Sequence, residues 1–374
     1  MRRSLAAGVL ICAGAIVISG CAPEQPLGAI AGTVTTATDT VTFDRSPTAF
    51  GDGFVAVRYP GEESADLTFV VTDGRTRWEV HTNPACAGFA VTRVDGDDLL
   101  VVLDSDASVQ DGRLASTTVA TAFRTDGTVA WGPEPVAGGL SDDGLITTEM
   151  LGGALSSETS PTIALSPSTG AALDLPAGER AVYAADGLLA TQAPDRVLVR
   201  DASDPSAPVL WRSAEVAPED ATGPATVTVG QEISVGSFLV LEWPTARGPV
   251  FTVHRFIDGT LLATLPGQPD ARTLVTPGGN VAIFTAETAG SRMVSGVSSE
   301  HGRLWTEDVP DGSLPVSAAA DEIWFTGSSG YLNRAISDDS FEPTEDPGPL
   351  LTLRSGFEVR STDTSRLYEI LPTS

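Results

Sequence analysis

The sequence predicts an all-β fold, a β-propeller in which small four-stranded antiparallel sheets (blades) surround an axis. Three observations lead to this prediction. Turns of the Asp-Gly type recur at spacings of 53, 43, about 36, 53 and 43 residues. Trp follows four of these turns, and Pro or Gly interrupts every stretch that could form an amphipathic helix. Repeats of this length suit propeller blades, which bury their faces only by stacking on one another. A β-sandwich or a pair of small β domains with chance turns is the alternative.

The first residues have the pattern of a bacterial secretion signal. Arg2 and Arg3 are followed by an apolar run over residues 5–18. Ile18-Ser19-Gly20-Cys21 then matches a lipobox, in which the Cys thiol accepts diacylglycerol. We therefore expect a cleaved signal peptide over 1–20, lipidation (including palmitate) at Cys21 and a tether over 21–28. A transmembrane anchor is the alternative, but the apolar run is short for a span. An extracytoplasmic lipoprotein of the cell membrane follows from this interpretation.

One structural unit repeats through the rest of the chain. It begins with an apolar strand, continues with an amphipathic strand and an Asp-Gly turn, and ends with a strand that often carries Trp. The turn residues singled out are Asp73, Gly74, Asp126, Gly127, Asp258 and Gly259, and the repeated Trp residues are Trp78, Trp131, Trp211 and Trp305. Gly suits such turns because it accepts positive φ. We expect each Trp to be buried between neighbouring blades. The apolar strands are predicted over 54–59, 98–103, 188–191, 238–241, 281–284 and 323–325.

The two ends of the chain predict how the ring closes. Residues 350–353, 356–361 and 366–371 supply three short strands, too few for a complete blade. Residues 29–43 contain spare strand-forming residues, and an open edge invites aggregation. We expect the N-terminal segment to complete the last blade within one domain over 29–374. Eight blades are preferred and seven are the alternative.

Composition limits the classes of function. The 374-residue chain has 49 acidic and 22 basic side chains, a net charge of -27 and no Lys. A surface this acidic argues against nucleic-acid binding. Exclusive use of Arg fits a G+C-rich genome, such as that of an actinobacterium. Three Cys exclude a disulfide-rich scaffold, and we expect a monomer.

The sequence contains weak candidates for chemistry. His81 and Cys86 form a conceivable dyad, whereas His301 replaces Asp at a turn. Acidic clusters at 95–98, 104–106 and 141–144 are compatible with one Ca²⁺ site. The same residues are standard in turns, which is the plainer interpretation. We therefore expect no catalytic residue and no cofactor, while the question of an enzyme stays open.

A family resemblance adds to this picture. The segment from Thr121 to Trp131 is similar to the repeat of the PQQ-binding-like (quinoprotein dehydrogenase-like) β-propellers, and the likeness extends weakly over residues 45–374. The resemblance raises the question of a quinone. Dehydrogenases of this type carry a Cys-Cys pair that is absent here, so we expect none.

In overall plan the chain resembles the propeller lipoprotein of the outer-membrane barrel-assembly machinery. That resemblance implies a non-catalytic scaffold or adaptor that binds another envelope protein. The alternatives are a solute-binding or sensory lipoprotein that uses the central channel, and a carboxylate-dependent hydrolase. Fold alone does not decide among them.

Overall fold

A computed structural model describes the chain over 30–31, 40–59, 65–71, 76–82, 88–105, 118–141, 144–148, 162–204, 208–228, 233–270, 273–288, 291–309, 313–328, 330–337, 340–361 and 367–372. In these residues the structure is built from strands, and the one helical element is a 3₁₀ turn over Ser213–Glu215. None of the described helical structure has the length and hydropathy needed to cross a membrane. The all-β prediction is therefore confirmed.

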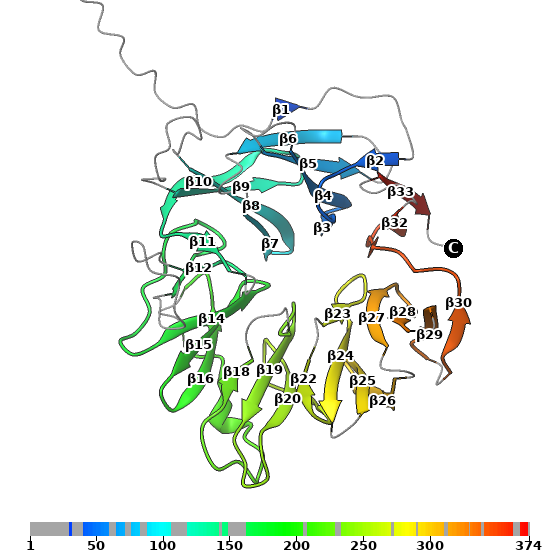
Figure 1. Cartoon of the computed structure of the whole chain (residues 1–374). Coiled ribbons are helices and arrows are strands. Elements are labelled where there is room, and N and C mark those ends of the chain that lie inside the picture. The colour runs from blue at the N-terminus through cyan, green and yellow to red at the C-terminus, as the bar shows by residue number, and fades with distance from the viewer. Residues whose placement is uncertain are drawn as a thin grey trace, which may run out of the picture.

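The described strands form eight antiparallel sheets, numbered 1 to 8 here, which follow one another round a central axis as a β-propeller (Figure 1). Sheet 1 contains β3 (Thr48–Phe50), β4 (Gly53–Arg58), β5 (Ala65–Val71), β6 (Thr76–Thr82) and β1 (Ile30–Ala31). Sheet 2 contains β7 (Phe89–Val94), β8 (Asp97–Ser105), β9 (Thr118–Arg124) and β10 (Val129–Val136). Sheet 3 contains β11 (Gly139–Leu140), β12 (Ile146–Thr148) and β13 (Thr162–Ala164). Sheet 4 contains β14 (Arg180–Ala185), β15 (Leu188–Ala193), β16 (Arg196–Asp201) and β17 (Trp211–Arg212).

The second half of the ring repeats this arrangement. Sheet 5 contains β18 (Thr226–Val227), β19 (Phe238–Trp243), β20 (Val250–Arg255) and β21 (Leu261–Thr264). Sheet 6 contains β22 (Gln268–Pro269), β23 (Leu274–Val275), β24 (Val281–Thr288), β25 (Ser291–Ser298) and β26 (Gly302–Asp308). Sheet 7 contains β27 (Leu314–Ala318), β28 (Glu322–Gly327), β29 (Gly330–Ala335) and β30 (Glu342–Thr344). Sheet 8 contains β31 (Leu351–Thr352), β32 (Phe357–Ser361), β33 (Leu367–Pro372) and β2 (Thr40–Thr42).

The predicted apolar strands all occupy the second position of their sheets, as β4, β8, β15, β19, β24 and β28. A strand in this position is covered by the sheets on either side, which explains its continuous apolar sequence. Hairpins lead into two of these strands through Asp95-Gly96 and Asp186-Gly187. Both residues of each pair have positive φ, as the two-residue turn of a twisted hairpin requires.

The chain ends join as expected, with one difference. β2 pairs antiparallel with β33, so that an N-terminal strand completes sheet 8. Phe43, next to β2, packs against Phe54 of sheet 1 and Tyr368 of sheet 8, with ring centroids 5.7 and 6.2 Å apart. The difference is β1, which was expected in the last blade but pairs instead with β6 at the outer edge of sheet 1. The N-terminal segment therefore pairs with both sheets that meet where the ring closes, with sheet 1 through β1 and with sheet 8 through β2.

Hydrophobic clusters fill the spaces between neighbouring sheets. A cluster of Phe50, Phe69, Trp78, Leu100 and Phe123, for example, joins sheets 1 and 2. Similar clusters join every following pair up to sheets 6 and 7, and another joins sheets 8 and 1. Between sheets 7 and 8 the described residues form a polar cavity instead. At that interface charged side chains lie beside the buried Trp324 and Leu353.

Candidate functional site

The four repeated Trp residues lie on the fourth strand of their sheets, counted from the axis: Trp78 on β6, Trp131 on β10, Trp211 on β17 and Trp305 on β26. Trp78, Trp131 and Trp211 are buried, and Trp305 is half-buried. The three buried indoles donate hydrogen bonds to backbone carbonyls of the next sheet's turn, at Thr125, Pro167 and Phe256 (3.0, 2.8 and 2.7 Å). These Trp residues therefore link one sheet to the next and do not line a site.

Trp305 has different surroundings. Its indole N–H is buried and has no acceptor among the described residues. The guanidinium carbon of Arg334, from sheet 7, lies 3.9 Å from the centroid of the Trp305 ring. Arg334 also forms a 2.8 Å ion pair with Glu307 on β26. A cation–π contact and an ion pair replace the indole hydrogen bond at this interface.

The Asp-Gly turns have structural roles. Asp126 accepts hydrogen bonds from the hydroxyl and the backbone N–H of Thr128, and these bonds lower the pKa of Asp126. Gly127 and Gly259 have positive φ. A Cβ on Gly259 would lie 2.7 Å from the Trp211 indole, so the turn can approach the indole only because it lacks a side chain. Asp258 accepts hydrogen bonds from Arg255 and Thr260. Cys21, Asp73 and Gly74 lie outside the described residues.

His254, on β20, is completely buried. Its Nδ1 lies 2.9 Å from the Gly259 carbonyl, which can only accept, so Nδ1 carries the proton. Its Nε2 accepts from the Thr252 hydroxyl (2.8 Å), and that hydroxyl accepts from the Trp243 indole (2.7 Å). Burial lowers the pKa of His254, and the network holds the neutral ring.

The remaining nucleophile and base candidates do not form a catalytic group in the described structure. His301 is exposed, 3.8 Å from the Glu300 carboxylate. His81 lies at the end of β6, and Cys86 is outside the described residues. The proposed dyad of His81 and Cys86 therefore stays a sequence-based hypothesis.

The polar cavity between sheets 7 and 8 has a volume of ≈ 710 Å³. Arg360 of β32 lines it and binds both oxygens of Asp346, in the segment between β30 and β31, at 2.6 and 2.8 Å. The same guanidinium binds Glu358, at 2.8 Å. Glu322 and the buried Trp324 line the cavity from sheet 7. The members of this cluster are far apart in the sequence, on β28, on β32 and between β30 and β31, so no local motif reveals it.

The pKa values of two of these carboxyl groups, Glu322 and Asp346, are shifted in opposite directions. Burial, together with the negative charges of Asp321, Glu358 and Asp346, raises the pKa of Glu322. The hydrogen bonds from Arg360 lower the pKa of Asp346. Neighbouring carboxyl groups with opposite shifts are a feature of acid–base sites, although ion-pair networks produce them too.

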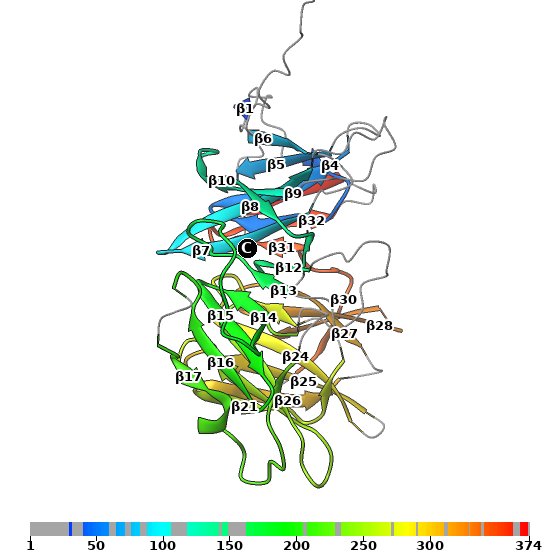
Figure 2. The ribbon, with the colours of Figure 1, turned by 90° about the vertical axis from the view of Figure 1, so that its left-hand side faces the viewer.

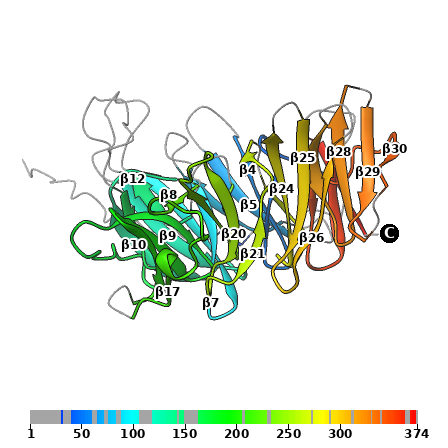
Figure 3. The same cartoon turned by 90° about the horizontal axis from the view of Figure 1, so that it is seen from below.

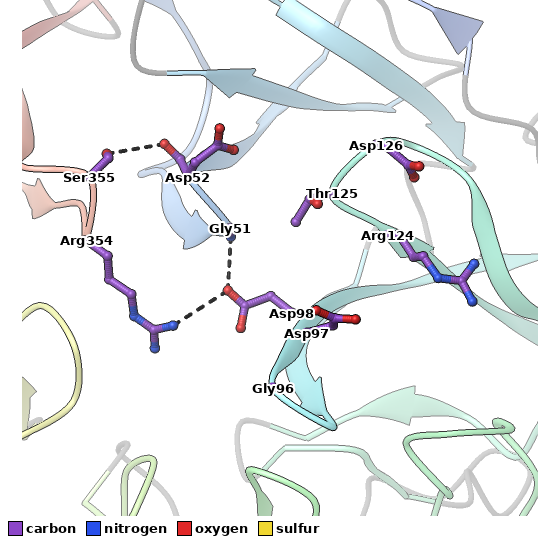
Figure 4. Close-up of a pocket in the computed structure, with 10 residues that line it drawn as sticks. All are labelled: Gly51, Asp52, Gly96, Asp97, Asp98, Arg124, Thr125, Asp126, Arg354 and Ser355. Carbon is purple, nitrogen blue, oxygen red and sulfur yellow. Dashed lines mark hydrogen bonds and ion pairs between the residues drawn. The ribbon is translucent and has the colours of Figure 1, made fainter.

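A second hollow, of ≈ 520 Å³, lies where sheets 8, 1 and 2 meet (Figure 4). Asp98 points into it and accepts from the backbone N–H of Gly51 (3.1 Å). Asp98 is also paired with Arg93 at 2.8 Å and lies 3.9 Å from Arg354. The carboxylate of one predicted acidic cluster is thus used to join sheets. The described residues contain no group of three or more His, Cys, Asp or Glu side chains placed to hold a metal ion.

The innermost strands enclose a central channel of ≈ 730 Å³. Its lining consists mainly of backbone and small or hydroxyl side chains, such as Thr92, Ser237, Thr276 and Thr352. The two aromatic residues of the lining, Phe50 and Tyr183, are buried in the clusters between sheets and do not form the open aromatic walls that would favour an apolar ligand. The channel therefore gives little support to a specific solute site.

The outer surface of sheets 4 to 6 carries an exposed apolar strip, defined by Leu210, Ile257, Leu261 and Leu304. These side chains are 49, 58, 54 and 40% exposed. Figure 3 shows that β17, β21 and β26, which carry or adjoin them, follow one another across this surface. The segments that carry these residues are neighbours, because Trp211 binds the Phe256 carbonyl and Gly302 closely approaches Leu262.

The sequence matches no described protein family and no curated protein. Several solved structures share its general outline. BamB from Moraxella catarrhalis has 10% identity and a TM-score of 0.34 over 80% of this chain and 99% of that chain. The Dos1 propeller has 8% identity and a TM-score of 0.39 over 93% of this chain and 94% of that chain. A prolyl endopeptidase has 16% identity and a TM-score of 0.41 over 79% of this chain and 47% of that chain. These values are too low to support an argument about function.

Proposed function

We propose that this protein is a lipid-anchored β-propeller of the bacterial cell envelope that binds another envelope protein as a non-catalytic scaffold or adaptor. The apolar strip on sheets 4 to 6 is the observation that carries the proposal. Large aliphatic side chains exposed on neighbouring segments of a surface are a feature of protein-binding sites. The lipobox at Cys21 supplies the proposed location, and the strip supplies the proposed binding surface.

The position of the strip supports this role. β1, next to the proposed tether, lies on the opposite side of the ring from sheets 4 to 6 in both views (Figures 1 and 2). A ring held at sheet 1 would present the strip away from its attachment. The net charge of -27 further favours a partner with a basic surface over a second copy of this chain.

Photo-cross-linking in cells tests the proposal. In one variant benzoylphenylalanine replaces Leu261 in the strip. In the control variant it replaces Val129, which occupies the same repeat position on sheet 2 and is 41% exposed. We expect one discrete adduct with an envelope protein from position 261 and none from position 129. The same adducts from both positions, or none from either, would contradict the proposal.

The cavity between sheets 7 and 8 supports a second candidate, a carboxylate-dependent hydrolase. The observation in its favour is the raised pKa of Glu322 beside the ionised Asp346. In such an enzyme Glu322 would donate a proton and the neighbouring charge would stabilise the transition state. A panel of nitrophenyl glycosides tests this candidate: turnover must be present, must be lost in Glu322→Gln, and must persist in the exposed control Glu300→Gln.

A further inference from the structure

The outer edge of β26 is an unusually open strand edge. No described strand pairs with it, and it has seven residues without Pro. Natural sheets protect their edges with short strands or Pro. The other unpaired outer strands show these protections: β10 contains Pro133 and Pro135, β30 contains Pro343, and β17 and β21 have two and four residues. The edge of β26 has neither a short strand nor Pro, and its charged residues are Arg303, Glu307 and Asp308.

The hydrogen-bond ladder shows which groups face outward. The Val309 N–H donates to the Arg292 carbonyl of β25, at 3.0 Å. Antiparallel pairs alternate between bonded and non-bonded, so Glu307 and Trp305 are also directed toward β25. Thr306 and Asp308 therefore direct their backbone N–H and C=O groups to the open edge. These groups are available to a further strand.

The chain itself fills the equivalent edge of sheet 1. On β6 the residue after Trp78 is Glu79, and it pairs with Ile30 of β1. Thr306 follows Trp305 in the same way, and both strands have an irregular register just before the Trp. β1 thus occupies on sheet 1 the position that is open on sheet 6. An added strand is compatible with the geometry of this edge.

We infer that the partner in the proposed function docks by adding an extended segment, with aliphatic and basic residues in alternation, to the outer edge of β26. This inference rests on the proposed function and names how the partner binds. Leu304 on β26 and Leu261 on the neighbouring β21 provide apolar contacts beside the edge. Exposed Glu300 and Asp308 lie at its two ends and exposed Arg303 lies between them, in a chain of net charge -27. Main-chain bonds would give affinity and the alternating side chains specificity.

A peptide-binding experiment with the full chain in detergent tests the inference. The probe is a labelled peptide, Arg-Val-Thr-Val-Arg-Val-Arg, followed by fluorescence anisotropy. Thr306→Pro removes an outward N–H while keeping the ladder to β25, and Thr306→Ser is the matched control. We expect Thr306→Pro to bind about tenfold more weakly or worse, and Thr306→Ser to bind as the unmodified chain does. A peptide with Glu in place of Arg should not bind.

A second measurement protects the test against misfolding of Thr306→Pro. Two further peptides are N-methylated, one at the odd and one at the even residues. Their affinities should differ, because the methyl groups of one peptide block the N–H groups that bond to β26, whereas those of the other lie on the side that faces away. Equal binding of both peptides, full binding by Thr306→Pro or no binding of the probe overturns strand addition. If the cross-link from position 261 persists in Thr306→Pro, the proposed function stands without strand addition. A cross-linked product of twice the chain mass identifies a second copy and overturns the inferred partner.

Discussion

Truncation of Trp211 to Ala tests whether the indoles on the outer strands hold the ring together. Trp211 is 3% exposed, packs against the turn at Gly259 and lies 5.9 Å from the His254 ring. Loss of a buried aromatic side chain costs about 3–5 kcal/mol. The Phe256 carbonyl would also lose its donor, which adds about 1–3 kcal/mol. The free energy of unfolding should therefore fall by about 4–8 kcal/mol.

This change converts into a shift in melting temperature. The entropy of unfolding of a 374-residue chain is about 0.8 kcal/mol/K, so Trp211→Ala should lower Tm by about 5–10 °C in calorimetry. Trp211→Phe keeps an aromatic ring but loses the hydrogen bond, so its Tm should lie between those of Trp211→Ala and the unmodified protein. Trp305→Ala is the matched control, because the Trp305 N–H has no described acceptor and its side chain is half-buried. The reasoning is refuted if Trp211→Ala melts within about 2 °C of the unmodified protein, or if its Tm is no lower than that of Trp305→Ala.

Three further predictions concern pH, closure and anchoring. His254 has a lowered pKa in the folded state, so stability is greatest above the ordinary His value and falls as pH decreases through it. Thermal melts between pH ~7.5 and ~5.5 should show a larger loss for the unmodified protein than for His254→Gln, and parallel curves would contradict this. Deletion of residues 28–43 removes β1 and β2, and it should lower Tm and cause aggregation in light scattering, whereas deletion of residues 22–26 should do neither. Cys21→Ser should release the protein from membranes, and sedimentation of this variant with membranes in high salt would reject the lipobox.

The repeat was readable from the sequence because each part of a blade has its own local signal. Residues 54–59 and 238–241 are apolar throughout because a second strand is covered on both faces. The Asp-Gly turns require positive φ, and the Trp residues fill the space beside them. Closure by β2 followed from counting the strands left over at the two ends of the chain.

The candidate sites depend on contacts that no local pattern contains. Asp346 and Arg360 meet only because sheets 7 and 8 are neighbours in the ring. Leu261 and Leu304 have the sequence pattern of ordinary strand residues, and their exposure follows from their place on outermost strands. His254 occurs in an alternating strand like a surface residue, yet it is buried because Trp211 of sheet 4 stacks on its ring and Thr252 and Gly259 contact its nitrogens. Such features can be recognised only when the arrangement of the sheets around the ring is known.

The two N-terminal strands determine how the ring bears mechanical load. A force on the N-terminus reaches β1 first, and β1 is held to β6 over two residue pairs. Its detachment would leave β2, with three pairs to β33, still closing the ring. The released residues 30–39 would lengthen the tether by at most about 3.6 Å each. A pull toward the membrane would therefore first extend the chain, and it would open the propeller only after β2 had also been stripped from sheet 8.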